Sequence, residues 1–316
     1  MNKNRLAFFD CARALCMLYI VAAWHLYGYL RSSVSLSTPL GNSITRGALS
    51  SFFFISAYFL GRRPIHSFRD ALDFYKKRMM RFYPLYFISC TSMLVIYLVT
   101  GVRYMESVKQ YLLTLLGLST VFTPAPATLW FISMLILFYL ITPLVNALQK
   151  VWQKVLLCAG LFGLLFILHG IGIPVDPRLP LYLPVYSLGL IIASRTEISG
   201  KFRPAVLLIS LIAFSGGVAL TSGFDRYTLQ YLVMLPFIPL ILEIGKLIAC
   251  CGPLERIFGF ISYGSMVAYL FHRQFFGLPL YFMGSFPIWF AYLVLVPALL
   301  VLSWLAQRCY DRIVGR

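Results

Sequence analysis

Long apolar runs, separated by short polar stretches, divide this chain almost from end to end. Ten of the runs are long and apolar enough to cross a lipid bilayer as helices. They cover residues 6–30, 44–61, 83–100, 128–147, 153–173, 180–194, 204–222, 228–245, 257–272 and 285–307. The pattern therefore predicts an all-α, polytopic integral membrane protein with about ten transmembrane helices.

An eleventh run, 108–122, has only about fifteen residues, fewer than a spanning helix usually needs. With ten spans, 19 of the 27 Lys and Arg residues fall on the side of the termini and 7 on the far side, and Arg13 lies within the membrane. If 108–122 also crossed, the division would be 12 against 14. Positive charges gather on the cytoplasmic side, so we expect both termini to be cytoplasmic and 108–122 to be a short re-entrant or interfacial helix on the far side.

The composition fits this assignment, since 60% of the 316 residues are hydrophobic and only 12% are charged. Soluble domains carry about 25% charged residues. No polar segment is long enough for a second domain, so we expect one transmembrane domain over residues 1–316, with its first span kept as an anchor. We interpret the net charge of +17 as Lys and Arg residues that set the orientation of the chain in the membrane. We therefore expect membrane lipid as a partner and no nucleic acid. The seven cysteines have no metal-binding spacing, and no metal is expected.

The first span carries Asp10, Arg13 and His25 in an otherwise apolar run. An ionisable group at bilayer depth costs roughly 3 kcal/mol, so it usually faces a cavity or a partner and marks a working site. Asp10 and Arg13 are three residues apart and can pair on one helix face. His25 titrates near neutral pH, which suits a general base. The alternative is a buried histidine whose hydrogen bonds are satisfied and which has no chemical role.

A basic segment, 62–81, precedes the third span and carries seven Lys and Arg residues against Asp70 and Asp73. We expect it to form an amphipathic helix on the cytoplasmic face. Its last cations lie beside the span and are suited to a phosphate-bearing ligand; they are Lys76, Lys77, Arg78 and Arg81. The alternative is a topology signal that also attracts anionic lipid. No glycine-rich phosphate loop is present, so nucleotide hydrolysis is not indicated.

Polar and aromatic side chains in three other spans are candidates for a substrate site. They are Ser56 and Tyr58 in the second span, Trp130 in the fourth, and Ser265, Tyr269 and His272 in the ninth. The alternatives are hydroxyls that serve helix packing and residues that anchor the chain at the membrane interface.

Five short motifs follow one another through the chain. They are Asp10-Cys11-Ala12-Arg13 with His25, Phe53-Phe54-Ile55-Ser56-Ala57, Arg78-Met79-Met80-Arg81-Phe82-Tyr83-Pro84, Leu129-Trp130-Phe131, and Ser265 with Tyr269, Leu270 and His272. In this order they resemble the membrane acyltransferase 3 family over nearly the whole chain. Ala57 stands where that family usually has glycine.

The resemblance implies an O-acyltransferase of the bacterial inner membrane that moves an acyl group, often acetyl, from acetyl-CoA or another acyl-CoA to a carbohydrate or lipid-linked acceptor. In that reaction His25 would take the proton of the acceptor hydroxyl. Arg13, paired with Asp10, would contact the phosphates of the donor or polarise its thioester. The cations Lys76, Lys77, Arg78 and Arg81 would hold the phosphates of CoA.

The spacing of Arg13 and His25 departs from the family pattern. The family usually has ten residues between them and this chain has eleven. At about 100° per residue, ten intervening residues place both side chains on one face, whereas eleven rotate His25 by roughly 120°. Either a π-bulge absorbs the extra residue, which we favour, or the two side chains face different neighbours.

Two other functions use the same pattern of spans. A transporter or flippase of a polysaccharide or lipid-linked glycan would need a similar kinked helix bundle. A non-catalytic membrane scaffold would need Arg13 and His25 only for stability. The basic segment followed by Pro84 favours an enzyme that uses CoA.

Overall fold

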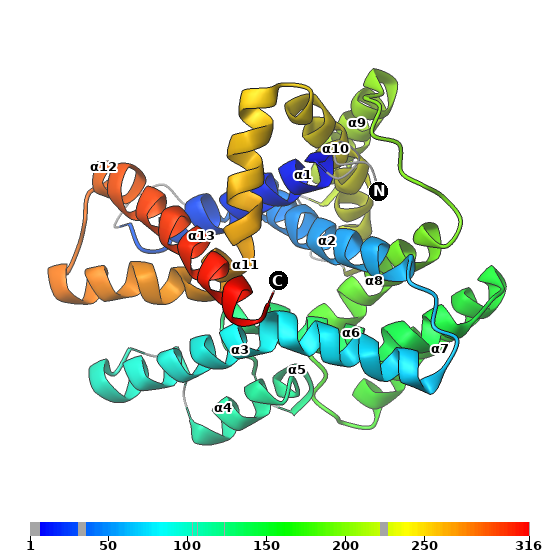
Figure 1. Ribbon diagram of the computed structural model, residues 1–316, viewed down its shortest axis with the longest axis horizontal. Helices are drawn as coiled ribbons and strands as arrows, with labels where there is room; N and C mark the ends of the chain where they lie inside the picture. Colours follow the sequence, from blue (N-terminus) through cyan, green and yellow to red (C-terminus); the bar gives the residue numbers. More distant parts are fainter. Residues whose placement is uncertain are drawn as a thin grey trace. The chain divides into compact units, whose positions relative to one another are not determined.

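The computed structural model describes residues 7–30, 36–102, 104–105, 107–122, 124–221 and 227–315, and in these ranges the only regular secondary structure is helix (Figure 1). The all-α prediction is confirmed. Leu6 and Ser222, at the ends of two predicted spans, lie outside the described residues. So do some of the charges used for the topology prediction, namely Lys3, Arg5, Arg31, Arg103, Arg226 and Arg316.

The chain forms two compact units, called unit 1 and unit 2. Unit 1 joins Met1–Phe52 to Ile198–Arg316, and unit 2 is Phe53–Glu197. The helix α2 (Pro39–Gly61) begins in unit 1 and ends in unit 2.

In unit 1, the first helix is the centre of the packing. It consists of α1 (Ala7–Leu18) followed by the π-helix η2 (Tyr19–His25). The later elements are α9 (Pro204–Thr221), η3 (Tyr227–Gln230), α10 (Tyr231–Ala249), α11 (Gly252–Met283), α12 (Ile288–Phe290), η4 (Ala291–Leu295) and α13 (Val296–Ile313). The helix α1 packs against α10 and α11, α10 packs against α9, and α11 packs against α13. Gly245 lets α10 approach α1 closely, because a Cβ there would lie 2.4 Å from the carbonyl oxygen of Phe8.

Unit 2 contains the end of α2 and six further helices. They are α3 (Phe68–Thr100), α4 (Val108–Leu115), α5 (Ser119–Phe122), α6 (Leu129–Ala147), α7 (Val151–Gly170) and α8 (Arg178–Ala193). A capping box starts α3: the Asp70 backbone N–H donates to Ser67 Oγ at 3.1 Å, and the Ser67 N–H donates to Asp70 Oδ2 at 2.9 Å. Gly101, with φ of 73°, ends α3 in the left-handed conformation that glycine favours.

The helix α3 corrects one prediction. The basic segment 62–81 and the third span were expected to be separate, but residues 68–81 of the segment and the whole span lie in this one 33-residue helix, which continues through Pro84, whereas Arg62 and Arg63 precede it. The reason is an apolar stripe at helical spacing on its buried side, formed by Phe74, Phe82 and Leu85. At 1.5 Å per residue α3 is about 50 Å long, longer than the ~30 Å hydrocarbon core. Its basic first part therefore extends beyond the core.

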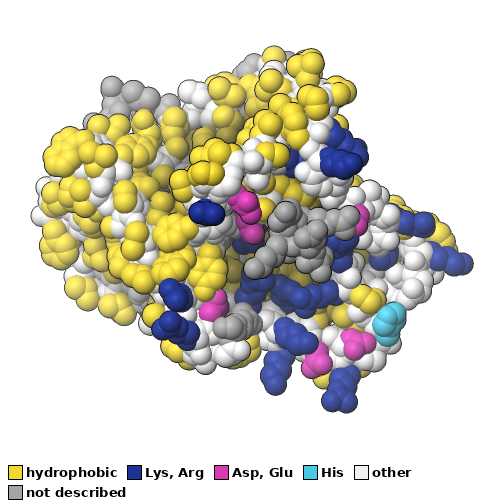
Figure 2. Space-filling model, turned by 45° about the horizontal axis from the view of Figure 1, so that its top comes forward, with side chains coloured by type: hydrophobic (Ala, Val, Ile, Leu, Met, Phe, Trp, Pro, Cys, Tyr) yellow, Lys and Arg dark blue, Asp and Glu magenta, His cyan; other side chains and the backbone are white. Residues whose placement is uncertain are grey.

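All ten predicted spans fall on helices. Among the described residues, eight helices are long and apolar enough to cross a membrane. The other two predicted spans fall on α8 and α11. The helix α8 has only 16 residues, and α11 has 32 residues but is not apolar enough to be counted among the eight. Several polar residues are buried in α11, including Ser262, Ser265 and His272. Figure 2 shows hydrophobic side chains over much of one face, as expected for helices that contact lipid.

The predicted short helix at 108–122 is not one of the helices long and apolar enough to cross a membrane. It is divided into α4, of 8 residues, and α5, of 4 residues, with Gly117 at φ of 72° between them. Eight helical residues cover only about 12 Å, well short of the ~30 Å core. This agrees with the re-entrant or interfacial assignment.

Candidate functional site

The first helix places two of its three ionisable residues against the same partner, α11. Near its start, the Ser262 hydroxyl donates to Asp10 Oδ1 at 3.0 Å, and Asp10 Oδ1 lies 3.7 Å from a guanidinium nitrogen of Arg13. The predicted pairing of Asp10 with Arg13 is therefore present. Both side chains of the pair are partly exposed, by 45% and 28%, so its contribution to stability is small.

Further along the same helix, η2 is a π-helix that ends at His25. A π-helix inserts one residue into the α-helical repeat and is frequent at functional sites. With one residue absorbed, the turn from Arg13 to His25 falls from roughly 120° to roughly 20°. The favoured explanation of the unusual spacing, a π-bulge, is confirmed.

His25 meets His272 of α11. Nε2 of His272 lies 2.7 Å from Nδ1 of His25, and the two ring planes differ by only 7°. Because 2.7 Å is a hydrogen-bond distance, the two nearly parallel rings, with centroids 4.7 Å apart, are joined through these nitrogens. His272 is completely buried, and its Nδ1 lies 2.8 Å from the Tyr269 carbonyl oxygen. His25 is half-buried. The contact holds the His25 ring toward α11.

These contacts also fix the direction of the helices. Asp10 meets Ser262, and His25, later on the first helix, meets His272, later on α11. The two helices therefore run parallel. Two spans that cross a membrane in the same direction are separated by an odd number of crossings, and seven predicted spans lie between them. A crossing at 108–122 would make eight and would require antiparallel helices.

The other two candidates on α11 lie near His272 but have different surroundings. The Ser265 hydroxyl donates to the Ser262 carbonyl at 2.7 Å, a bond within the helix. Tyr269 is buried, with its ring centroid 5.8 Å from that of His272. Ser265 therefore makes a hydrogen bond within its own helix, whereas Tyr269 packs against His272.

The predicted cations of unit 2 differ among themselves. Arg78 is half-buried and its Nε is buried without a hydrogen-bond partner. Its guanidinium carbon lies 5.9 Å from the centre of the Phe74 ring, and its charge interacts with Tyr139, Arg81 and Arg63. A buried N–H of a cation that lacks an acceptor is costly and is suited to an anionic ligand. Lys76, Lys77 and Arg81 are exposed.

The remaining candidates of unit 2 have protein partners. The hydroxyls of Ser56 and Tyr139 lie 3.4 Å apart, and the Tyr58 hydroxyl donates to the Thr196 carbonyl at 3.5 Å. The Trp130 ring centroid lies 6.0 Å from that of Tyr182, and the guanidinium carbon of Arg178 lies 4.1 Å from the centre of the Trp130 ring. The indole of Trp130 therefore contacts two residues of α8.

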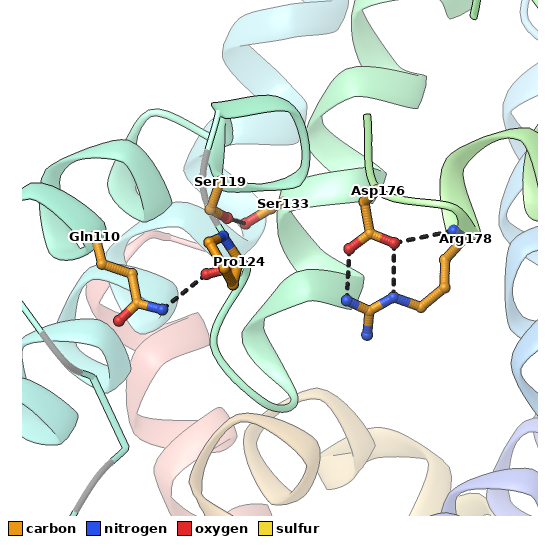
Figure 3. A network of polar contacts seen from close by, with 6 residues as sticks. All are labelled: Gln110, Ser119, Pro124, Ser133, Asp176 and Arg178. Atoms are coloured by element: carbon orange, nitrogen blue, oxygen red, sulfur yellow. Dashed lines mark hydrogen bonds and ion pairs between the residues drawn. The ribbon is translucent and has the colours of Figure 1, made fainter. Parts of the chain in front are cut away.

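A polar network surrounds the start of α8 in unit 2 (Figure 3). The Arg178 guanidinium binds both carboxylate oxygens of Asp176, and the Arg178 backbone N–H donates to Asp176 Oδ1 at 2.9 Å. Nearby, Gln110 Nε2 donates to the Pro124 carbonyl at 2.7 Å, and the Ser119 hydroxyl donates to Ser133 Oγ at 3.0 Å. These contacts fix the loops that surround α4, α5 and the start of α6.

Sequence reasoning missed three residues that the structure brings to these sites, namely Ser262, Tyr139 and Arg178. Ser262 lies ten residues before His272, and nothing in its local sequence distinguishes it from a packing hydroxyl. The one feature of the sequence that could have pointed to Ser262 is that its predicted span is more polar than the others. Among the described residues, no group of three His, Cys, Asp or Glu side chains could hold a metal ion.

One comparison with known proteins gives a match. A family model described as an acyltransferase domain, that of acyltransferase family 3, matches residues 6–308. No curated protein and no solved structure matches the chain.

Proposed function

This chain belongs to the membrane acyltransferase 3 family, and we propose that it transfers an acyl group, in the simplest case acetyl, from acyl-CoA to a hydroxyl of a carbohydrate or lipid-linked saccharide. The family and the apolar helices make it a multi-pass membrane acyltransferase. The donor, the acceptor and a place in the bacterial inner membrane are the proposed parts. The observation that carries the proposal is the His25–His272 contact at the end of a π-helix in the first span.

The proposed reaction uses His25 first as a base and then as an acid. His25 takes the proton from the acceptor hydroxyl while that oxygen attacks the thioester carbonyl carbon. A carbon–oxygen bond forms and the carbon–sulfur bond breaks. The His25 imidazolium then gives its proton to the departing CoA thiolate, so the products are an ester and free CoA.

Arg13 has a role at a distance from the reacting atoms. It precedes His25 by twelve residues, about 18 Å along a helix. Helix side chains lean toward the N-terminus, so the Arg13 guanidinium points away from the imidazole. Of the two roles expected for Arg13, we therefore propose contact with the phosphates at the far end of the pantetheine arm. The Asp10 carboxylate orients it.

Arg78 is the second proposed anion contact. The lack of an acceptor for its buried Nε supports a bound phosphate more than it supports a lipid headgroup at the surface. The exposed cations Lys76, Lys77 and Arg81 would increase the local concentration of a polyanionic donor. Acceptor binding stays a prediction for all six candidates, Ser56, Tyr58, Trp130, Ser265, Tyr269 and His272.

The test is transfer of radiolabelled acetyl from acetyl-CoA to a bacterial lipid-linked saccharide fraction by the purified full chain in lipid nanodiscs. Label released by mild base identifies an ester. We expect His25→Ala to lower the rate by about 10²–10⁴-fold, the usual contribution of a general base. His169→Ala is the matched control, since His169 lies at the end of α7 in unit 2, and it should keep the full rate.

Arg13→Gln should raise KM for acetyl-CoA and leave kcat nearly unchanged. A His25→Ala protein that inserts normally and transfers at the full rate would remove His25 as the base. Movement of the saccharide across vesicles without any labelling would favour the transporter instead.

A further inference from the structure

His272 is the only described partner that holds the His25 ring by a hydrogen bond. It is completely buried, and both of its ring nitrogens are engaged. Its Nδ1 faces the Tyr269 carbonyl oxygen at 2.8 Å, and the Ala268 carbonyl also interacts with the ring. Its Nε2 faces Nδ1 of His25 at 2.7 Å.

The backbone carbonyls determine where the proton of His272 lies. A carbonyl oxygen only accepts hydrogen bonds, so Nδ1 of His272 must carry the hydrogen. A neutral imidazole has one N–H, and a second proton on this fully buried ring would put a charge where no water can stabilise it. Nε2 of His272 therefore bears a lone pair and acts as an acceptor.

The same logic then applies to His25. Because Nε2 of His272 accepts, Nδ1 of His25 must donate and must carry the hydrogen of the neutral ring. The lone pair of His25 is left on Nε2, the nitrogen that does not face His272. We infer that His272 is a positioning residue that fixes His25 in the Nδ1–H tautomer and aims its basic Nε2 away from α11. This deepens the proposed function, since it rests on His25 as the base.

The arrangement also accounts for the charged form of His25. When Nε2 takes the proton of the acceptor, the Nδ1–H of the new imidazolium still donates to His272. The ring keeps its orientation until it returns the proton to the thiolate. The other ring nitrogen of His272 faces backbone carbonyls, which cannot carry a proton onward. The proton therefore leaves His25 by Nε2, the nitrogen at which it arrived.

A direct test is nitrogen-15 NMR of histidine-labelled full chain in nanodiscs. The chain has four histidines, His25, His66, His169 and His272, so single substitutions assign the signals. We expect a protonated Nδ1 and an unprotonated Nε2 for His25, and the same tautomer for His272. A wild-type His25 with its hydrogen on Nε2 would overturn the inference, whether or not the protein transfers acyl groups.

Two variants test the consequence for catalysis. His272→Gln can place an amide oxygen where Nε2 lies and can still accept from His25, whereas His272→Leu cannot. We expect His272→Leu to lower kcat by about 10²-fold, within the range of general-base effects, with KM for acetyl-CoA unchanged. His272→Gln should recover most of the rate. Equal losses in both variants, or no loss in His272→Leu, would contradict the positioning role.

The outcomes separate this inference from the proposed function. A protein that shows the expected tautomer but transfers no acyl group would overturn the proposed function and leave the tautomer assignment standing. A protein that transfers acyl groups with His25 in the other tautomer would overturn the tautomer assignment and leave the proposed function standing. The tautomer is read from the wild-type chain, so a poorly folded His272 variant does not remove the test.

Discussion

Arg78 and Arg81 lie one helical turn apart on α3 but have different surroundings. The first has a buried Nε without an acceptor, and the second is exposed. Their charges interact with each other, so an anion near Arg78 would relieve a repulsion as well as satisfy a donor. Since both are cations on the same helix, they form a matched pair for testing where a phosphate binds.

We predict that Arg78→Gln weakens acetyl-CoA binding by at least tenfold, the loss of a charge-assisted hydrogen bond of about 1.5–3 kcal/mol. Arg81→Gln should weaken it by less than threefold, because an exposed charge contributes under about 1 kcal/mol. Isothermal titration of the nanodisc-embedded chain with acetyl-CoA measures both. Equal losses would mean that the basic segment acts only through its total charge.

How far single residues could be predicted depended on whether their partners are near in sequence. The Asp10–Arg13 pair follows from an i, i+3 spacing, and the structure has it. The His25–His272 contact joins residues 247 positions apart, and no spacing rule brings them together. His272 was accordingly expected to bind substrate, although the structure engages both of its nitrogens within the protein.

At the scale of elements, η2 connects a feature of the sequence to the geometry of the site. Eleven residues between Arg13 and His25, against the ten usual in the family, favoured an irregular helix over the alternative that the two side chains face different neighbours, because a regular helix would turn His25 away. The continuity of α3 could not be predicted in the same way. Proline usually ends a helix, and only the packing of Phe74, Phe82 and Leu85 within unit 2 overrides that signal.

The π-helix gives a prediction with opposite outcomes for deletion and insertion. Deleting Ala23 removes the extra residue, so η2 should become α-helical with His25 still facing His272, and transfer should stay within about tenfold of wild type. Inserting an alanine after Ala23 should rotate His25 by about 100° and lower transfer by 10²-fold or more. The acetyl-transfer assay measures both. An active insertion together with an inactive deletion would mean that η2 does not orient His25.

Unit 2 compensates for the alanine that stands where the family usually has glycine. Ala57 is completely buried in α2, and Gly189 of α8 faces it. A Cβ at Gly189 would lie 2.7 Å from both the Ala57 Cβ and the Phe54 carbonyl oxygen. Close packing of two helices needs a small residue at their contact. Here Gly189 of α8 supplies that small residue in place of a glycine at position 57 of α2.

We predict that Gly189→Ala destabilises the protein by about 1–3 kcal/mol, the usual effect of overpacking. Gly163→Ala is the control: Gly163 lies within α7, where a Cβ meets no atom within 4 Å, and this change should be neutral or stabilise the protein by up to about 1 kcal/mol, the gain of alanine over glycine within a helix. Thermal unfolding of the purified variants, followed by circular dichroism, compares them. An unchanged Tm for Gly189→Ala would show that α2 and α8 can separate at this point without loss.

For the whole molecule, the central question is how many times the chain crosses the membrane. Three observations agree that 108–122 is not one of the crossings: the distribution of Lys and Arg, the shortness of α4 and α5, and the parallel course of the first helix and α11. The first could be obtained from sequence alone, since it needs only the positions of the charges. The last depends on contacts between distant residues and requires the structure.

The cysteines of the chain allow this topology to be tested directly. Cys250, Cys251 and Cys309 are exposed, whereas Cys11, Cys16, Cys90 and Cys158 are buried. With ten spans, position 109 follows three crossings and Cys250 follows eight, so they lie on opposite sides. If 108–122 also crossed, Cys250 would follow nine crossings and lie on the same side as position 109.

We therefore predict that a membrane-impermeant maleimide labels a Lys109→Cys variant in right-side-out vesicles and labels Cys250, Cys251 and Cys309 only in inside-out vesicles. The wild-type chain is the control for the native cysteines, and mass spectrometry of the labelled peptides identifies each site. Labelling of position 109 and Cys250 from one side would require an extra crossing between them. The first helix and α11 would then have to cross in opposite directions, which the Asp10–Ser262 and His25–His272 contacts do not allow.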